Sequence, residues 1–228
     1  VLAEEANRRT QELIQEAAAA VFGSPVARRL EADGQIHEYD LSGEWPVKTM
    51  IGALSEALGE PVSLDTPVET LRALATTHGL EEPPQADAGM LLEELYVELV
   101  ESQTLTPVFY RDFPKNNAPL TRVHRADPRL TEKWDLVCWG AEQGTGYSEL
   151  IDPLDQRDRF YQQSLRAAGG DLEAMQLDED FLRALEYGRP TAGAQGMGID
   201  RLVMNLPGLG VRDTILFPLT KPSQSPSQ

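Results

Sequence analysis

The sequence predicts an α+β fold, and two observations carry that prediction. Apolar residues recur at helical spacing in some segments and alternate with a period of two in others. The two kinds of segment follow one another without a strict strand–helix alternation, which a doubly wound parallel sheet would require. We therefore expect a sheet flanked by helices.

In the N-terminal half, the pattern predicts helices over residues 10–22, 46–58, 66–79 and 89–100 and a strand over 34–42. Thr10 is expected to cap the first helix and Gly23 to end it, because these residue types favour helix termini. Thr66 is expected to begin the third helix, with Pro67 in its first position. Residues 81–88 are expected to be the clearest internal loop.

In the C-terminal half, the pattern predicts strands over residues 106–110 and 145–149, helices over 152–168 and 178–188, and a last strand over 214–217. Asp152 and Asp178 are expected to cap the two helices. The polar, proline-broken tail from Lys221 is expected to be disordered. The sequence has no internal repeats.

Composition excludes several classes of protein. The 228 residues are 41% hydrophobic and 25% charged, which is ordinary for a globular protein, and the formal net charge of −17 argues against a general nucleic-acid-binding surface. The single cysteine, Cys138, excludes an internal disulfide and is expected to be buried. The sequence contains neither a run of 18 apolar residues nor a signal peptide, so a cytoplasmic location is expected. Three scattered histidines lack metal-ligand spacing.

The stretch GMGIDRLVM, residues 196–204, indicates a strand that passes through a glycine turn into a buried helix. Arg201 would lie in the first turn of this helix, where the helix dipole favours an anion such as a phosphate. The alternative is a glycine-rich turn before a core helix, with Asp200 and Arg201 as a solvated pair.

The acidic run DLVCWGAEQGTGYSELID, residues 135–152, indicates a second part of a site. On a strand over 145–149, Thr145, Tyr147 and Glu149 share one face. Asp135 and Glu142 are seven residues apart, which places them on opposite faces of a flat strand. A hairpin that turns at Cys138 and Trp139 would instead bring them opposite one another, where a shared Mg²⁺ would offset their repulsion. The alternative is a strand with a charged outer face.

A basic cluster lies within residues 115–129 of this acidic chain, and it has two interpretations. It is either a solvated loop that balances neighbouring acids or a surface against substrate phosphates. Its members are Lys115, Arg122, His124, Arg125 and Arg129.

These motifs resemble those of a known family. GMGIDRLVM resembles motif 3 of class II aminoacyl-tRNA synthetases, and EQGTGYSELIDPLDQRDRF resembles the acidic strand and following helix of class II lysyl-tRNA synthetases. EELYVELVE, TPVFYRDFPKNNAPLTR, LDEDFLRALEYG and RDTILFP extend the resemblance over most of the chain. TRVHRADPRLTEKWDL and GEWPVK resemble the synthetase domain of actinobacterial lysyl enzymes, a group that includes bifunctional proteins passing lysine to a membrane lipid. The resemblance implies a mostly antiparallel sheet flanked by helices, with the active site on the sheet.

The resemblance also implies roles for the acidic run. Asp135 and Glu142 match the positions that hold Mg²⁺ between ATP phosphates. Tyr147 and Glu149 match the positions that receive the lysine side-chain ammonium, and a buried carboxylate with a phenol suits a cationic substrate. Thr145 is a further lysine-binding position.

Gly196 and Gly198 match the glycines that let the nucleotide approach, and Arg201 matches the catalytic arginine that contacts ATP. The implied reaction joins lysine and ATP into lysyl-adenylate and pyrophosphate, followed by transfer to an acceptor. Positioning and electrostatics do most of the work in such phosphoryl chemistry.

The sequence departs from the family pattern in three respects. Thr145 and Ile151 stand where the family commonly has asparagines, which affects contacts to the amino-acid backbone. The resemblance lacks motif 1, motif 2 and the anticodon-binding domain, so residues 1–220 are expected to be the C-terminal part of a catalytic domain and 221–228 a disordered tail. Motif 1 forms the family's dimer interface, so either a homodimer or a chain or segment that carries motifs 1 and 2 is an expected partner.

Three hypotheses follow. The first is a lysine–tRNA ligase that reaches tRNA through parts absent here, with no membrane contact from this segment. The second is a paralogue that delivers activated lysine to another acceptor, such as a phospholipid. The third is a non-catalytic module that binds lysine or nucleotide.

Overall fold

The computed structural model describes residues 2–81, 86–170 and 174–217 and divides the chain into two compact units. Unit 1 comprises residues 1–13 and 43–197, and unit 2 comprises residues 14–42 and 198–228. Each unit is described by itself below. The predicted disorder from Lys221 lies outside the described residues.

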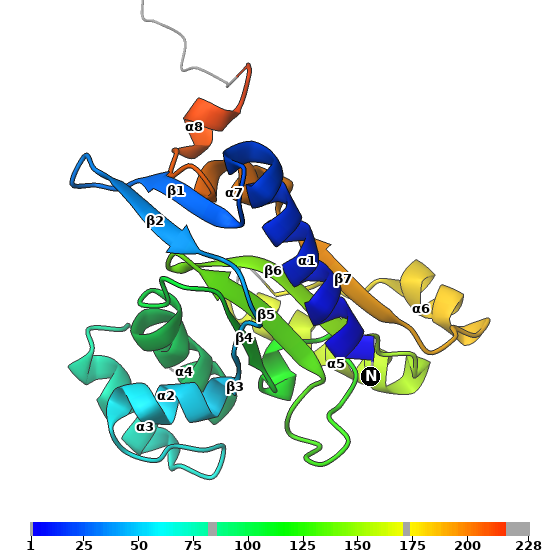
Figure 1. Cartoon of the computed structure of the whole chain (residues 1–228). Coiled ribbons are helices and arrows are strands. Elements are labelled where there is room, and N and C mark those ends of the chain that lie inside the picture. The colour runs from blue at the N-terminus through cyan, green and yellow to red at the C-terminus, as the bar shows by residue number, and fades with distance from the viewer. Residues whose placement is uncertain (1, 82–85, 171–173, 218–228) are drawn as a thin grey trace, which may run out of the picture. The chain divides into compact units, whose positions relative to one another are not determined.

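The described part of unit 1 is built on one sheet with the strand order β3-β4-β5-β6-β7 (Figure 1). β3 pairs with β4 in parallel, and the other neighbours are antiparallel. The strands are β3 (Val47–Thr49), β4 (Val108–Arg111), β5 (Lys133–Cys138), β6 (Ala141–Ser148) and β7 (Gly193–Met197). This mostly antiparallel sheet with surrounding helices confirms the α+β prediction.

Three helices of unit 1, α4, α5 and α6, begin where an aspartate side chain satisfies a free backbone amide. Asp87 accepts from Met90 N at 3.0 Å, Asp152 from Leu154 N at 2.9 Å, and Asp178 from Phe181 N at 2.9 Å. The described helices are α2 (Met50–Leu58), α3 (Val68–Thr77), α4 (Ala88–Tyr96, continued by a π-turn over Val97–Glu101), a 3₁₀ turn (Lys115–Asn117), α5 (Pro153–Ala168) and α6 (Glu179–Glu186).

One face of the sheet packs against the group formed by α2, α3 and α4, which Figure 1 shows beside β3 and β4. Tyr110 of β4 meets Tyr96 of α4 edge to face, with ring centroids 5.3 Å apart. Val137 of β5 is fully buried in the same cluster. Apolar burial therefore fixes α4 against the central strands.

The other face carries Trp134, whose ring centroid lies 5.2 Å from that of Phe109 at an interplanar angle of 83°. Trp134 pairs across the strands with Gly146, and a Cβ placed on Gly146 would lie 2.3 Å from the indole ring. β6 can pass over this indole because position 146 has no side chain.

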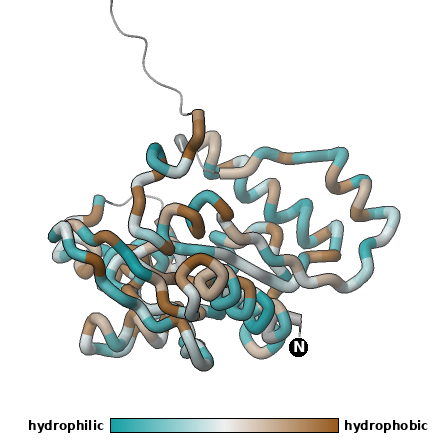
Figure 2. The backbone as a smooth tube through the Cα atoms, turned by 45° about the horizontal axis from the view of Figure 1, so that its top comes forward, coloured by the Kyte–Doolittle hydropathy of each residue, from teal (hydrophilic) through white to brown (hydrophobic). Residues whose placement is uncertain are grey.

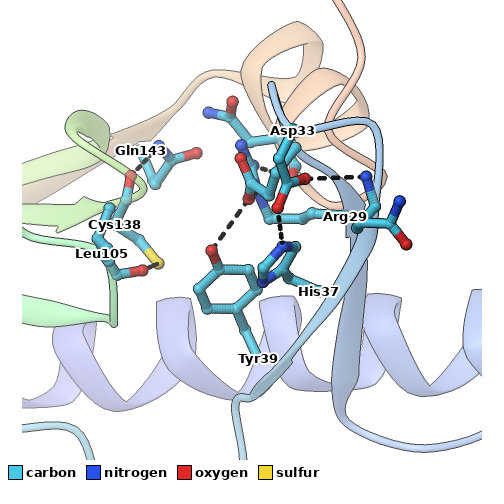
Figure 3. Close-up of polar contacts among 10 residues, drawn as sticks. Arg29, Asp33, His37, Tyr39, Leu105, Cys138 and Gln143 are labelled. Carbon is cyan, nitrogen blue, oxygen red and sulfur yellow. Dashed lines mark hydrogen bonds and ion pairs between the residues drawn. The ribbon is translucent and has the colours of Figure 1, made fainter.

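Unit 2 contains the end of α1 (Leu2–Phe22), the antiparallel hairpin of β1 (Val26–Leu30) and β2 (Ile36–Asp40), and the short helices α7 (Ile199–Asn205) and α8 (Val211–Thr214). The hairpin and the C-terminal segment are joined by one backbone–backbone and one side-chain–backbone hydrogen bond. Leu30 N donates to Pro207 O at 3.0 Å, and Arg29 Nη1 donates to Asn205 O. Figure 3 shows Asp33 and His37 turned toward one another at the hairpin, with His37 Nε2 2.8 Å from Asp33 Oδ2, while the Tyr39 hydroxyl donates to Glu31 Oε1 at 3.0 Å.

Several predicted helix boundaries in the N-terminal half were wrong. Thr10 does not begin a helix: it is buried inside α1, and its hydroxyl donates to Ala6 O at 2.9 Å. Residues 47–49 form β3, and Thr49 caps α2 by accepting from Gly52 N at 3.2 Å. Pro67 is the N-cap of α3 and not its first residue.

Two predictions near the C-terminus were also wrong. Residues 214–217 form no strand, because α8 runs through Thr214 and the chain then bends. The helix after the glycine turn is only partly buried, since Leu202 is buried while Ile199 and Val203 are exposed. β1 was not predicted, because Arg28 and Arg29 interrupt its apolar pattern.

Hydrophilic and hydrophobic residues are interspersed along the backbone in Figure 2. Among the described residues, no helix is both long enough and apolar enough to cross a membrane.

Candidate active site

Strands β5, β6 and β7 of unit 1 bring three predicted site residues into one cross-strand row. Asp135 of β5 pairs with Thr145 of β6, which in turn pairs with Gly196 of β7. Residues directly opposite one another point to the same face of a sheet. An added Cβ at Gly196 would meet no atom within 4 Å, so this end of the row is open.

Glu142 joins this face through a β-bulge. The pairing shifts between Leu136 and Val137, so that Glu142 faces Val137 and Gln143 is the extra residue. The bulge reverses the side-chain alternation and turns Glu142 toward the face of Asp135. The prediction that these two acids lie directly opposite one another was wrong, since Asp135 faces Thr145 and Glu142 lies farther along the hairpin.

The turn of this hairpin is Trp139–Gly140, one residue beyond the predicted Cys138–Trp139. Trp139 has φ 55° and Gly140 has φ 75°, as a two-residue primed turn requires. Gln143 is buried, and its amide donates to Cys138 O at 3.0 Å (Figure 3) and to Ala141 O at 2.9 Å. Cys138 is buried, as predicted, and its Sγ donates to Leu105 O at 3.3 Å.

Lys133 is a site residue that the sequence prediction missed. Its Nζ lies 2.7 Å from Asp135 Oδ2 and 4.2 Å from the centroid of the Phe113 ring. Burial disfavours its charge, but the nearby Asp135 and Glu93 outweigh burial and raise the pKa of Lys133. Two-residue spacing on one strand places Lys133 and Asp135 on the same face, and that spacing was the available signal.

Two further carboxylates from α4 and its π-turn lie close to this ion pair. Burial raises the pKa of Glu93, against the opposing charge of Lys133 and a hydrogen bond from Asn117. Burial also raises the pKa of Glu101, which accepts from Glu142 N at 3.3 Å. The region is thus strongly acidic and partly desolvated, which suits a cationic ligand.

A divalent cation fits this arrangement if both the protein and the substrate supply its ligands. Asp135 Oδ1 is buried and has no hydrogen-bond partner among the described residues, so it has a free coordination position. No described group of three His, Cys, Asp or Glu side chains could hold a metal ion by itself. Mg²⁺ commonly takes one or two carboxylates and completes its shell with substrate phosphates and water.

Glu149 follows β6 and forms a bridge with Thr121. Its backbone N donates to Ala192 O at 2.9 Å, and its Oε1 lies 3.0 Å from Arg189 Nη2. Burial raises the pKa of Tyr147, and the charge of Glu149 adds to that rise. The sequence prediction missed Arg189, which is forty residues from Glu149 and has no periodic pattern around it.

Thr145 uses its hydroxyl to donate to Trp134 O at 3.2 Å. Toward a ligand this hydroxyl can therefore act as an acceptor. An asparagine amide, which the family commonly has at this position, could both donate and accept a hydrogen bond. Thr145 therefore offers a substrate fewer hydrogen-bonding groups than the family's asparagine does.

The two remaining predicted residues belong to unit 2. Gly198 is the N-cap of α7 and Arg201 lies exposed in its first turn, which confirms the predicted passage from strand through glycine to helix. The structure therefore groups Asp135, Glu142, Thr145, Tyr147 and Gly196 on one sheet, with Glu149 directly after it, and describes Gly198 and Arg201 separately.

Ion pairs within the basic cluster agree with a solvated loop that balances neighbouring acids. Arg125 pairs with Glu132 at 2.8 Å and His124 lies 3.7 Å from Asp112. Arg129 pairs with both Asp65 and Asp127.

Comparisons with known proteins identify relatives over nearly the whole chain. Residues 3–221 match the family described as tRNA synthetases class II (D, K and N). The chain is 54% identical over 212 residues to the lysylphosphatidylglycerol biosynthesis bifunctional protein LysX of Mycolicibacterium vanbaalenii, and 55% identical over 212 residues to that of Mycobacterium marinum. It is 51% identical over 214 residues to the same protein of Rhodococcus opacus. These alignments cover 93% to 94% of this chain but 19% of each relative.

Proposed function

Because the chain belongs to the class II tRNA synthetases of the D, K and N group, we propose that it activates lysine with ATP. The products of this step are lysyl-adenylate and pyrophosphate. The lysine carboxylate attacks the α-phosphorus of ATP, a P–O bond forms to the carboxylate, and the bond to pyrophosphate breaks. No side-chain nucleophile is required, so the chain's task is to bind, orient and neutralise charge.

The observation that carries the proposal is Glu149, a carboxylate with an 11% exposed side chain beside the half-buried Tyr147. A carboxylate removed from water at the end of a sheet strand favours a cationic partner, and Arg189 supplies one at 3.0 Å in the chain without substrate. The side-chain ammonium of lysine is a second cation that suits this carboxylate, and the phenol adds a hydrogen-bonding group. Thr145 lies on the same face and would accept a hydrogen bond from the substrate.

ATP is proposed to lie along the row that contains Asp135 and Gly196, with Asp135 and Glu142 as ligands of Mg²⁺. The free Oδ1 of Asp135 supports this assignment. When bound there, Mg²⁺ would neutralise phosphate charge. Gly196 offers a close backbone approach, because no atom lies within 4 Å of its added Cβ. Gly198 and Arg201 are assigned to ATP by their match to the family motif.

The acceptor is proposed to be tRNA, in keeping with the family. A second candidate acceptor is a phospholipid. The names of the relatives, lysylphosphatidylglycerol biosynthesis bifunctional proteins, favour this candidate. The chain spans 19% of the length of those relatives, about a fifth, so transfer to a lipid is the alternative proposal.

Lysine-dependent exchange of pyrophosphate into ATP tests the activation step. We expect exchange that requires both lysine and Mg²⁺, and we expect Glu149→Gln to reduce lysine affinity about 100-fold, since an unpaired buried ammonium costs roughly 3 kcal/mol. Transfer of labelled lysine to tRNA or to phosphatidylglycerol vesicles then separates the two acceptors. Binding of lysine or ATP without exchange would refute the enzymatic proposal and favour a binding module.

A further inference from the structure

Arg189 pairs with the carboxylate that we assign to the substrate ammonium. Its Nη2 lies 3.0 Å from Glu149 Oε1, and the side chains are 32% and 11% exposed. Glu149 thus already has an internal cation at the position where lysine would bring a second one.

The local backbone holds Arg189 in this place. Gly188 has φ 104°, which side-chain-bearing residues rarely adopt, and Pro190 restricts Arg189 to extended conformations. Ala192, two residues beyond Pro190, accepts the backbone N–H of Glu149 at 2.9 Å. The connection from α6 to β7 is therefore anchored beside Glu149 by its own backbone.

The charges of Glu149 and Arg189 both affect the pKa of the neighbouring Tyr147. The negative charge of Glu149 contributes to the raised pKa of Tyr147, while Arg189 acts in the opposite direction. An ammonium placed between Tyr147 and Glu149 would be attracted by the carboxylate and repelled by the guanidinium.

On the basis of the proposed function, we propose that Arg189 competes with the lysine ammonium for Glu149 and thereby sets the affinity and selectivity of the amino-acid site. Glu149 is the fixed member of the pair, because it follows β6 and bridges to Thr121. Arg189 lies in an irregular connection and is about one-third exposed, at 32%, so its guanidinium can turn to water at small cost. Lysine binding exchanges one cation for another at the same carboxylate.

This exchange discriminates between ligands by their charge. A neutral side chain of equal length, such as that of norleucine, cannot replace the guanidinium and leaves the ion pair intact. The lysine ammonium can pair with the Glu149 carboxylate only when it displaces the guanidinium of Arg189. Removing the guanidinium should therefore strengthen the binding of lysine and leave the binding of norleucine unchanged.

The test is isothermal titration calorimetry of lysine and norleucine on the 228-residue chain and its variants. We expect Arg189→Met to bind lysine about twofold to fivefold more tightly, which is the range for a partly exposed ion pair. Arg189→Lys keeps the cation and is expected to stay near the wild-type affinity. Arg183→Met is the matched control, because it removes the same charge from α6 at a residue whose side chain is 67% exposed and pairs with Asp180 at 3.4 Å.

Circular dichroism and thermal unfolding of each variant verify that it is folded. If wild type binds lysine and Glu149→Gln does not, while Arg189→Met binds lysine no more tightly than wild type, the competition is refuted and the proposed function stands. An equal gain in Arg183→Met also refutes it, because general charge would then explain the effect. If neither wild type nor any variant binds lysine, the proposed function itself fails, and the competition fails with it.

Discussion

The packing of Gly146 against Trp134 leads to a sharp prediction. Replacing Gly146 with Ala places a methyl group 2.3 Å from Cζ2, 2.4 Å from Cε2 and 2.8 Å from Nε1 of the indole. All three separations are well below van der Waals contact, so either the indole or β6 must move.

The indole has little room to move. Trp134 is 1% exposed and packs edge to face on Phe109, which is 2% exposed. Insertion of a methylene-sized group into a tight core costs about 1–3 kcal/mol, and the upper end applies here because the site is closed on both sides. We expect Gly146→Ala to lower the free energy of unfolding by about 3 kcal/mol.

Gly196 provides a matched control on the neighbouring strand. Its added Cβ meets no atom within 4 Å, and it has no positive φ to strain, so Gly196→Ala should leave stability unchanged or raise it by up to about 1 kcal/mol. The same substitution should weaken ATP binding, because the methyl group projects into the open end of the row that we assign to the nucleotide.

Urea unfolding followed by tryptophan fluorescence and far-UV circular dichroism measures both variants. Equal urea midpoints of unfolding for Gly146→Ala and Gly196→Ala would refute the reasoning, since the added methyl group would then have the same effect on stability at both positions. A destabilised Gly196→Ala would contradict the open space at that position.

Two other substitutions, one in each unit, test contacts that are expected to stabilise the fold. Arg159 lowers the pKa of Asp155, so their ion pair at 2.8 Å stabilises the fold at neutral pH, and that contribution is lost as pH falls below the usual value of 3.8 and through the lowered pKa. We expect Asp155→Asn to cost about 2 kcal/mol at pH 7 and progressively less as the pH falls below 3.8, measured by urea unfolding across pH, and a constant cost would contradict this. Gly208 has φ 74° and its added Cβ would lie 2.5 Å from Leu30 O, so Gly208→Ala should destabilise unit 2 by about 2–3 kcal/mol. Hydrogen exchange should then accelerate at Leu30 N and not at Glu149 N in unit 1, and equal acceleration at both would refute local destabilisation.

Local sequence signals determined the elements that depend on nearby residues. The apolar periodicity of α4, the aspartate caps of α5 and α6, and the passage from strand through Gly198 to α7 were all predicted. Each depends on contacts a few residues apart, where residue type and spacing are sufficient. The family of the chain was also identified from short motifs.

The tertiary structure decided what depends on register and long-range pairing. A single extra residue, Gln143, turned Glu142 onto the face of Asp135, and no periodicity could place that bulge. β3 was hidden in an apparent helix because its backbone hydrogen bonds go to β4, about sixty residues away. The ion pair of Arg189 with Glu149 likewise joins a loop to a strand end. Sequence determined which chemical groups are available, whereas folding decided which carboxylate each cation meets.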